Sequence, residues 1–225
     1  MYLYNHPDKA LNESVLGRVR MLVPDDNLSN KSHDINSEKQ ADLLRKLLDI
    51  KTPLFPSDAI AKLPKVKIVV AEELPYSASA RYENQNWIIT LNGQEKPLRQ
   101  RFSLAHEIKH IIDHPTKYEL YLDFVGITHN NKAEHQADYF AANLLMPREH
   151  VLRLYKRGMC TPTELAKIFQ VSPRAMHIRM HQLKLTTTWQ RCKLRVKYKW
   201  LVLKLLIRLF VKIWHLIPFP EGFKV

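Results

Sequence analysis

Residues 101–115, RFSLAHEIKHIIDHP, constrain the fold most strongly because they predict one helix with two chemically different faces. At about 100° per residue, five apolar residues fall on one side of this helix, namely Leu104, Ala105, Ile108, Ile111 and Ile112. His106, Glu107 and His110 fall on the other side. Histidines four residues apart are neighbours on a helix, so both imidazoles can bind one ion while Glu107 reaches a water beside it.

Two histidines do not complete a catalytic zinc site, which normally has three protein ligands and one open position. A third histidine in the pattern H-E-x-x-H-x-x-G-x-x-H would fall at Thr116, with Asp113 where the glycine belongs. The sequence therefore excludes that class of metal site.

A second helix offers the missing ligand. The stretch AEHQADYFAANLLMP places Glu134 and Asp138 one turn apart on a helix that its alanines and leucines predict to be largely buried. Buried carboxylates are costly unless a metal or a hydrogen-bond donor compensates them. We expect Glu134 to bind the metal and Asp138 to accept the outer N–H of a ligand histidine. The alternatives for the third ligand are His114, His129 and His135.

The two stretches together resemble the ImmA/IrrE family of zinc metallopeptidases, and the resemblance extends over about residues 37–185. It implies that His106, His110 and Glu134 bind one zinc ion per chain and that Glu107 is the catalytic glutamate. Members often carry glycine before the second histidine, where this chain has Lys109. That glycine is not a ligand, so the difference bears on substrate fit rather than on metal binding.

The ligand set predicts peptide hydrolysis in which Glu107 takes a proton from water and delivers it to the leaving amine. The tetrahedral oxyanion needs a hydrogen-bond donor besides the metal. The candidates for this donor are Arg81, Tyr82, Tyr118, Tyr139 and His129.

Strand-like stretches precede a run of helices, which predicts an α+β fold with a small, mainly antiparallel sheet. The stretches KVKIVVAE, SASARYEN and NWIITLN have the composition of strands, and that order suits a zincin-like metallopeptidase domain. We predict a flexible lead-in over residues 1–36, which is rich in Asn, Asp and Ser, and the metallopeptidase domain over residues 37–160. Ser37 and Gln40 form a capping-box pattern before the first helix of that domain.

Residues 161–185 predict two short helices arranged like a helix-turn-helix. Thr161, Pro162 and Glu164 have the pattern of a capped helix start, and Ser172 with Pro173 starts the second helix. Arg174, His177, Arg179 and His181 could read DNA, but we favour packing of these helices on the domain, as in proteins of the resembling family.

Residues 186–225 predict a basic tail that contains an apolar helix. Residues 189–225 hold nine Lys or Arg and one acid, so a net charge of +8 out of the chain's +13 lies there. Lys204, Arg208 and Lys212 form a basic stripe on the helix predicted over residues 200–217, which favours an anionic membrane surface or protein docking over direct nucleic-acid binding. We expect no nucleotide cofactor, because the five scattered glycines cannot form a phosphate loop.

The function predicted from these features is a zinc-dependent endopeptidase of narrow specificity. Two cysteines and an opening without an apolar run predict a cytoplasmic protein, with membrane association through the tail. The resemblance implies cleavage of a helix-turn-helix transcriptional repressor in a mobile-element or stress-response switch. Two alternatives remain open: a non-proteolytic, toxin-like or regulatory partner of such a repressor, and a DNA-binding regulator that uses residues 161–185.

Overall fold

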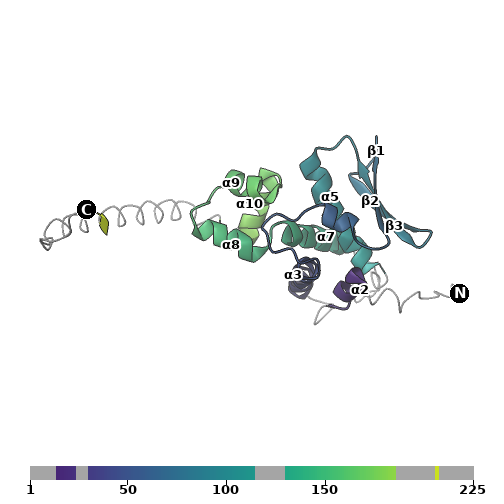
Figure 1. The fold of residues 1–225 in the computed structure, drawn as a ribbon, viewed down its shortest axis with the longest axis horizontal. Coiled ribbons are helices and arrows are strands. Elements are labelled where there is room, and N and C mark those ends of the chain that lie inside the picture. The colour runs from purple at the N-terminus through teal and green to yellow at the C-terminus, as the bar shows by residue number, and fades with distance from the viewer. Residues whose placement is uncertain (1–13, 24–29, 115–129, 186–205, 208–225) are drawn as a thin grey trace, which may run out of the picture.

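The computed structural model describes residues 14–23, 30–114, 130–185 and 206–207 (Figure 1). A small sheet and several helices confirm the predicted α+β class. In chain order the elements are α2 (Val15–Arg20), α3 (Asn30–Leu47), α4 (Asp58–Ala61), β1 (Val66–Ala71), β2 (Ala78–Glu83), β3 (Asn86–Asn92), α5 (Pro97–Asp113), α7 (Asn130–Leu145), α8 (Arg148–Lys156), α9 (Pro162–Phe169) and α10 (Pro173–Gln182).

The sheet has the strand order β1-β3-β2. β2 and β3 pair antiparallel as a hairpin, and its turn residues Asn84 and Gln85 both have positive φ, as a type I′ turn requires. β1 pairs with the other side of β3 and runs parallel to it. The sheet is therefore mixed rather than mainly antiparallel, because the hairpin occupies one edge of β3 and leaves the other edge to a parallel strand.

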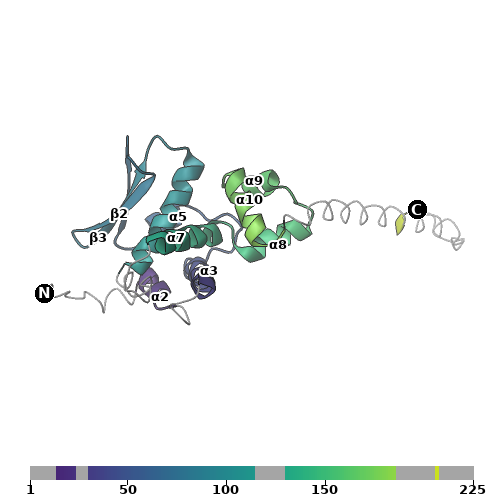
Figure 2. The ribbon, with the colours of Figure 1, turned by 180° about the vertical axis from the view of Figure 1, so that it is seen from behind.

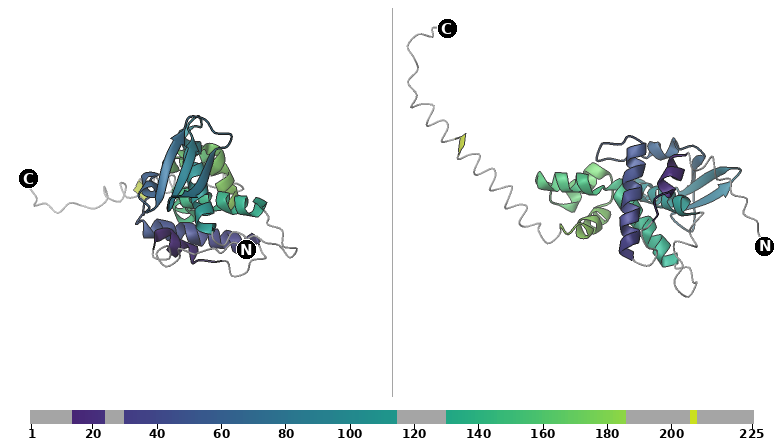
Figure 3. Two further views of the ribbon diagram at one scale, coloured as in Figure 1. Left: turned by 90° about the vertical axis from the view of Figure 1, so that its right-hand side faces the viewer. Right: turned by 90° about the horizontal axis from the view of Figure 1, so that it is seen from below.

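The helices form layers behind the sheet (Figures 1 and 2). α5 packs against β2 and β3 on one side and against α7 on the other, and α3 packs against α7. Figure 3 (left) shows the sheet in front of these helices, and Figure 1 shows α8, α9 and α10 at the end of α7 that is far from the sheet. The predicted apolar face of α5 is confirmed as buried, at Leu104, Ala105, Ile108, Ile111 and Ile112.

The N-terminal part of the chain differs from the predicted flexible lead-in. Leu16 and Val19 of α2 are buried, and α3 starts at Asn30 rather than near Ser37. Ser37 lies inside α3, where its hydroxyl donates to the side-chain oxygen of Gln136 at 2.7 Å, so the predicted capping box is wrong. The serine serves packing between helices α3 and α7. Residues 1–13 and 24–29 lie outside the described residues.

The C-terminal end of α5 is bound by an arginine from α2. The Arg20 guanidinium donates to the carbonyl of Ile112 at 2.8 Å and to that of Ile111 at 3.1 Å. Carbonyls in the last turn of a helix lack intrahelical donors, and a cation there also favours the helix dipole. α2 therefore stabilises the helix that carries the His-Glu-x-x-His motif.

The C-terminal end of α7 is bound by two buried arginines. Arg45 of α3 donates to the carbonyl of Leu144 at 2.9 Å, and Arg179 of α10 donates to that of Met146 at 3.0 Å. A second nitrogen of Arg179 donates to the side-chain oxygen of Asn143 at 2.6 Å. Burial lowers the pKa of both guanidinium groups, that of Arg45 to about 10, so Arg45 remains cationic at neutral pH.

The helix-turn-helix-like segment has the predicted helices. The capping box of Thr161 and Glu164 is present at the start of α9, and Ser172 caps α10. Arg179, one of four candidate DNA-reading residues, is buried against the end of α7, while the other three are exposed: Arg174, His177 and His181. Arg179 of α10 therefore serves packing against the end of α7.

Most of the predicted basic tail lies outside the described residues. Only Leu206 and Ile207 are described, as helical and exposed. Across the parts of the chain that the structure describes, no helix combines the length and the apolar character needed to cross a membrane.

Arg179→Met is expected to lower the free energy of unfolding by about 2–4 kcal/mol, because the carbonyl of Met146 and the amide of Asn143 then lose a buried donor. Arg174→Met on the exposed side of the same helix is the matched control and should change it by no more than about 0.5 kcal/mol. Urea denaturation followed by circular dichroism measures both values. Equal stability of the two variants would show that the buried contacts contribute nothing.

Candidate metal centre

Three side chains from two helices converge at the interface of α5 and α7. The Nε2 atoms of His106 and His110 lie 3.0 Å apart. A Glu134 oxygen lies 3.1 Å from Nε2 of His106, and the other lies 3.4 Å from Nε2 of His110. The structure thus brings together the three residues that the sequence suggested as metal ligands, with all ligand atoms within 4.8 Å of one another.

The donor set fits a zinc ion. Nitrogen and oxygen ligands of zinc lie about 2.0–2.2 Å from the metal, so two ligands of a tetrahedral ion are roughly 3.3–3.5 Å apart. The three observed separations of 3.0, 3.1 and 3.4 Å lie close to that range. Two imidazoles and one carboxylate leave a fourth position of the tetrahedron for water or substrate.

Asp138 lies behind His106 rather than beside the other ligand atoms. Its carboxylate is 2.9 Å from Nδ1 of His106, which leaves Nε2 of that ring directed at His110 and Glu134. Burial alone lowers the pKa of His106, but the hydrogen bond to Asp138 and the charges of Asp138, Glu134 and Glu107 raise it above its ordinary value. A field that favours a proton on this ring also favours a bound cation.

The two carboxylates of α7 are exposed, which the sequence did not predict. The side chains of Glu134 and Asp138 are 57% and 64% exposed. The prediction that these two carboxylates are buried is therefore wrong. α7 buries Ala133, Ala137 and Phe140 and turns its acidic side toward solvent. The metal centre is therefore open on the α7 side.

Two of the three alternative third ligands, His114 and His135, contact other residues. His135 points toward Asp34, whose carboxylate is 3.2 Å from its Nε2, and its ring lies beside Tyr139. The ring of His114 packs edge-on against Trp87 with 4.9 Å between centroids. His129 is outside the described residues.

Glu107 lies next to the three-residue cluster without joining it. Its carboxylate accepts a hydrogen bond from the backbone of Ala80 in β2. Burial raises the pKa of Glu107, the positive charge of His106 lowers it, and Glu134 raises it, so the pKa lies above the ordinary glutamate value. No sequence pattern points to Ala80, because its contribution is a backbone N–H that any residue except proline supplies.

The structure narrows the set of candidate oxyanion donors. Arg81 pairs with Glu83 at 3.1 Å and is turned to the side of β2 opposite Ala80. Tyr139 hydrogen-bonds to Arg179, away from the metal centre. Tyr118 and His129 lie outside the described residues. Among the candidates that the structure describes, Tyr82 alone remains, on the same face of β2 as Ala80.

Lys109 does not reach the substrate side of α5. It is buried, and its ammonium donates to the carboxylate of Asp113 at 2.6 Å. The side chain therefore forms an internal ion pair along its own helix, and the effect of this position on substrate fit stays a prediction.

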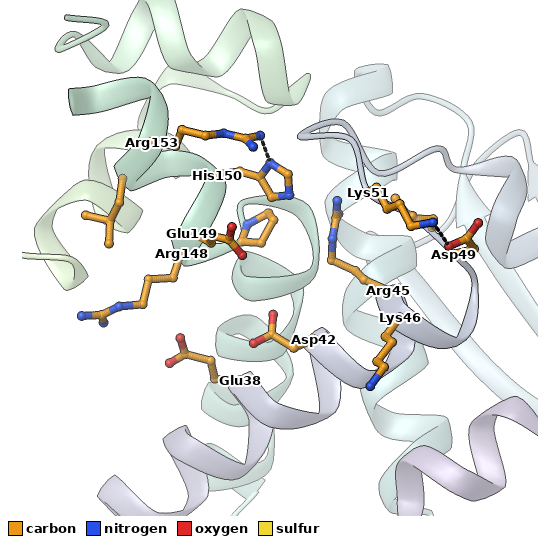
Figure 4. Close-up of a pocket in the computed structure, with 13 residues that line it drawn as sticks. Glu38, Asp42, Arg45, Lys46, Asp49, Lys51, Arg148, Glu149, His150 and Arg153 are labelled. Atoms are coloured by element: carbon orange, nitrogen blue, oxygen red, sulfur yellow. Dashed lines mark hydrogen bonds and ion pairs between the residues drawn. The ribbon is translucent and has the colours of Figure 1, made fainter. Parts of the chain in front are cut away.

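A pocket of about 770 Å³ lies between α3 and α8 (Figure 4). Its lining includes Arg45 and carries both signs of charge, with Glu38 and Asp42 on α3 and Arg148 and Glu149 on α8. Burial and the charge of Glu38 raise the pKa of Asp42. The pocket contains none of the three clustered residues, so it is separate from the metal centre.

The fold and this site together define a zincin-like metallopeptidase domain. Residues 66–181 match the peptidase M78 family, described as the IrrE N-terminal-like domain. The chain therefore belongs to the IrrE N-terminal-like family of peptidases, and the resemblance seen in the sequence is confirmed. Such a family implies a bound metal ion, which the two histidines and Glu134 can hold.

Two further similarities were found. The chain is 34% identical over 90 residues to the radiation response metalloprotease IrrE of Deinococcus deserti, which covers 39% of this chain and 32% of that protein. The chain thus spans about a third of that relative's length. A solved structure described as a Mycobacterium tuberculosis transcriptional regulator has a TM-score of 0.50 and 17% identity, covering 72% of this chain and 50% of that one. This second similarity concerns the fold alone.

The purified protein is expected to hold about one zinc ion per chain, and His110→Ala or Glu134→Ala should lose most of it, because two ligands bind zinc far more weakly than three. His135→Ala is the matched control, since this neighbour of Glu134 contacts Asp34 instead and should leave the zinc content unchanged. Atomic absorption on dialysed protein measures the zinc content. Full zinc in both ligand variants would rule out this centre.

Asp138→Asn is expected to weaken zinc affinity by about 10- to 100-fold without abolishing binding, because an amide orients His106 less well than a carboxylate. Competition with a chelator measures the affinity. A loss as complete as that of His110→Ala would instead make Asp138 a direct ligand.

Proposed function

We propose that this chain is a zinc-dependent endopeptidase of narrow specificity, with His106, His110 and Glu134 as the metal ligands and Glu107 as the catalytic base. The observation that carries the proposal is the position of Glu107, beside the three-residue cluster and hydrogen-bonded to the backbone of β2. Family membership supports the metallopeptidase class. The arrangement corresponds to a His-Glu-x-x-His motif completed by a glutamate from a second helix.

The bound metal, Glu107 and the backbone of Ala80 would have different roles in peptide hydrolysis. When bound, zinc supplies a Lewis acid that polarises the scissile carbonyl and acidifies the attacking water. Glu107 accepts the proton of that water and delivers it to the amine nitrogen as the C–N bond breaks. The bond from Ala80 fixes the carboxylate and leaves acceptor capacity for the proton. The raised pKa of Glu107 suits it to both steps, because a base must also hold the proton until the amine leaves.

β2 supports an extended substrate. It is an edge strand of the described sheet and lies against α5, so a peptide can pair with it beside the metal centre. A flexible segment of a protein fits such an edge better than a folded helix does. This requirement favours an endopeptidase that cuts exposed linkers.

We further propose that the substrate is a helix-turn-helix transcriptional repressor of a mobile-element or stress-response switch. The proposal rests on the resemblance to the ImmA/IrrE family, and the relative in Deinococcus deserti is itself described as a radiation response metalloprotease. Incubation of the zinc-loaded protein with a repressor encoded next to it tests the substrate by mass spectrometry of the fragments.

The non-proteolytic alternative, a toxin-like or regulatory partner of such a repressor, predicts binding of the repressor without cleavage. An intact Glu107 beside the cluster favours the enzyme. Direct DNA reading through residues 161–185 is disfavoured because Arg179 is used for packing. Association of the predicted tail helix, residues 200–217, with an anionic membrane or with a protein remains a proposal based on sequence.

Glu107→Gln is expected to keep the fold and the zinc content while lowering kcat by at least about 100-fold, because an amide cannot accept the proton. Cleavage of a verified substrate and zinc content are measured on the same preparation. Wild-type cleavage by this variant would contradict the proposed role of Glu107.

A further inference from the structure

The free edge of β2 presents its backbone groups at alternate residues. In the antiparallel pair of β2 and β3, the backbone N–H of Asn92 donates to the carbonyl of Ser77 at 3.0 Å. Hydrogen-bonded and non-hydrogen-bonded pairs alternate along such a ladder, so the backbone groups of Ala78, Ala80 and Tyr82 point away from β3. The bond from Ala80 to Glu107 agrees with this direction. A substrate strand added to β2 would therefore pair with Ala78 and Tyr82 and with the carbonyl of Ala80, because the N–H of Ala80 is bonded to Glu107.

Side chains on the α5 side of β2 change abruptly in size. Ala78 and Ala80 pack against the core there and extend no further than a methyl group. Tyr82 follows two residues after Ala80, which is about 6.6–6.8 Å farther along the strand. Tyr82 is thus the first large side chain that a bound peptide meets beyond the position of Glu107.

Tyr82 belongs to a row of three rings that joins the sheet to α5. Its ring centroid lies 5.2 Å from that of Trp87, its partner in β3, and Trp87 lies 4.9 Å from His114. Trp87 is only 9% exposed, whereas Tyr82 is 44% exposed and His114 is also exposed. The row therefore has a fixed centre and two accessible rings.

The row lies just beyond the metal centre. His114 follows His110 by one helical turn, so it is displaced about 6 Å along α5 from that candidate ligand. β2 advances by a similar length from Ala80 to Tyr82. The two accessible rings lie at the same end of the site because both contact the ring of Trp87.

We propose that Tyr82, Trp87 and His114 form an aromatic subsite that selects a large apolar side chain, best an aromatic one, two residues from the scissile bond. In an added strand, the residue opposite Tyr82 is two positions from the residue opposite Ala80, and its side chain lies on the same face as the rings. The subsite deepens the proposed peptidase function and rests on it. It names the substrate class as extended segments with one aromatic or large aliphatic residue at a fixed distance from the cleaved bond.

Cleavage of a library of randomised decapeptides by the zinc-loaded full chain tests the subsite. We expect enrichment of Phe, Tyr, Leu or Met over Ala at one position, two residues from the cleaved bond. In matched peptides, Tyr82→Ala should lower the Phe-to-Ala ratio of kcat/KM by about 3- to 10-fold, because only the Phe peptide loses a contact with the ring. Enrichment that persists in Tyr82→Ala, or no enrichment at this position, would overturn the subsite.

Two further variants separate the ring from the hydroxyl. Tyr82→Phe keeps the ring and should retain the preference, whereas loss in Tyr82→Phe equal to that in Tyr82→Ala would overturn the aromatic subsite in favour of a hydroxyl role. Tyr76→Ala is the matched control, because Tyr76 has a similar exposure of 51% but precedes β2 at its other end. It should leave the preference intact.

Binding distinguishes failure of the subsite from failure of the proposed peptidase. The zinc-loaded Glu107→Gln protein, immobilised and exposed to the same library, should retain peptides with the same aromatic preference. The double variant Glu107→Gln/Tyr82→Ala should retain peptides without that preference. Selective binding without cleavage by the wild type would support the subsite and contradict the peptidase. Cleavage without the preference would contradict only the subsite, and an absence of selective binding would overturn it.

Discussion

The metal centre depends on how the carbonyls at the C-terminal ends of α5 and α7 are bound. Arg20 binds the last carbonyls of α5, while Arg45 and Arg179 bind those of α7. The C-terminal ends of α5 and α7 are therefore both bound by guanidinium groups from other elements. Because His106 and His110 lie on one helix and Glu134 on the other, the ligand separations hold only if these two helices keep their relative position. The three arginines come from α2, α3 and α10, so three other elements hold these two helices in place.

These contacts extend the folding unit beyond the residues that match the family. Arg20 and Arg45 precede residue 66, where the match begins, yet one binds the metal helix and the other binds α7. α3 lies along α7 and joins it through the bond between Ser37 and Gln136. The N-terminal helices are thus part of the structure that holds the centre, although they contribute none of its proposed ligands.

Several features of the fold and the site could be predicted from the sequence, because they depend on patterns of neighbouring residues. The apolar spacing of α5, the capping box at Thr161 and the paired acids of α7 each need only a few neighbouring residues. Three features depended on distant contacts that no local pattern encodes. α3 extends back to Asn30 and packs on α7, β1 pairs with β3 rather than with the next strand in the chain, and Ala80 bonds Glu107 through its backbone. The exposure of Glu134 was missed because helical spacing does not tell which part of a helix has no covering neighbour.

The buried ion pair of Lys109 and Asp113 links two positions of the metal helix. Loss of Asp113 leaves the Lys109 ammonium as a buried charge without this carboxylate, which costs about 3–5 kcal/mol, whereas joint replacement by apolar residues is often neutral. A change of Asp113 to an uncharged residue is therefore tolerated best when Lys109 changes with it. Across the family, an uncharged residue in place of Asp113 should therefore be accompanied by an uncharged residue, such as glycine, in place of Lys109, and α5 can diverge at both positions without altering its proposed zinc-binding face.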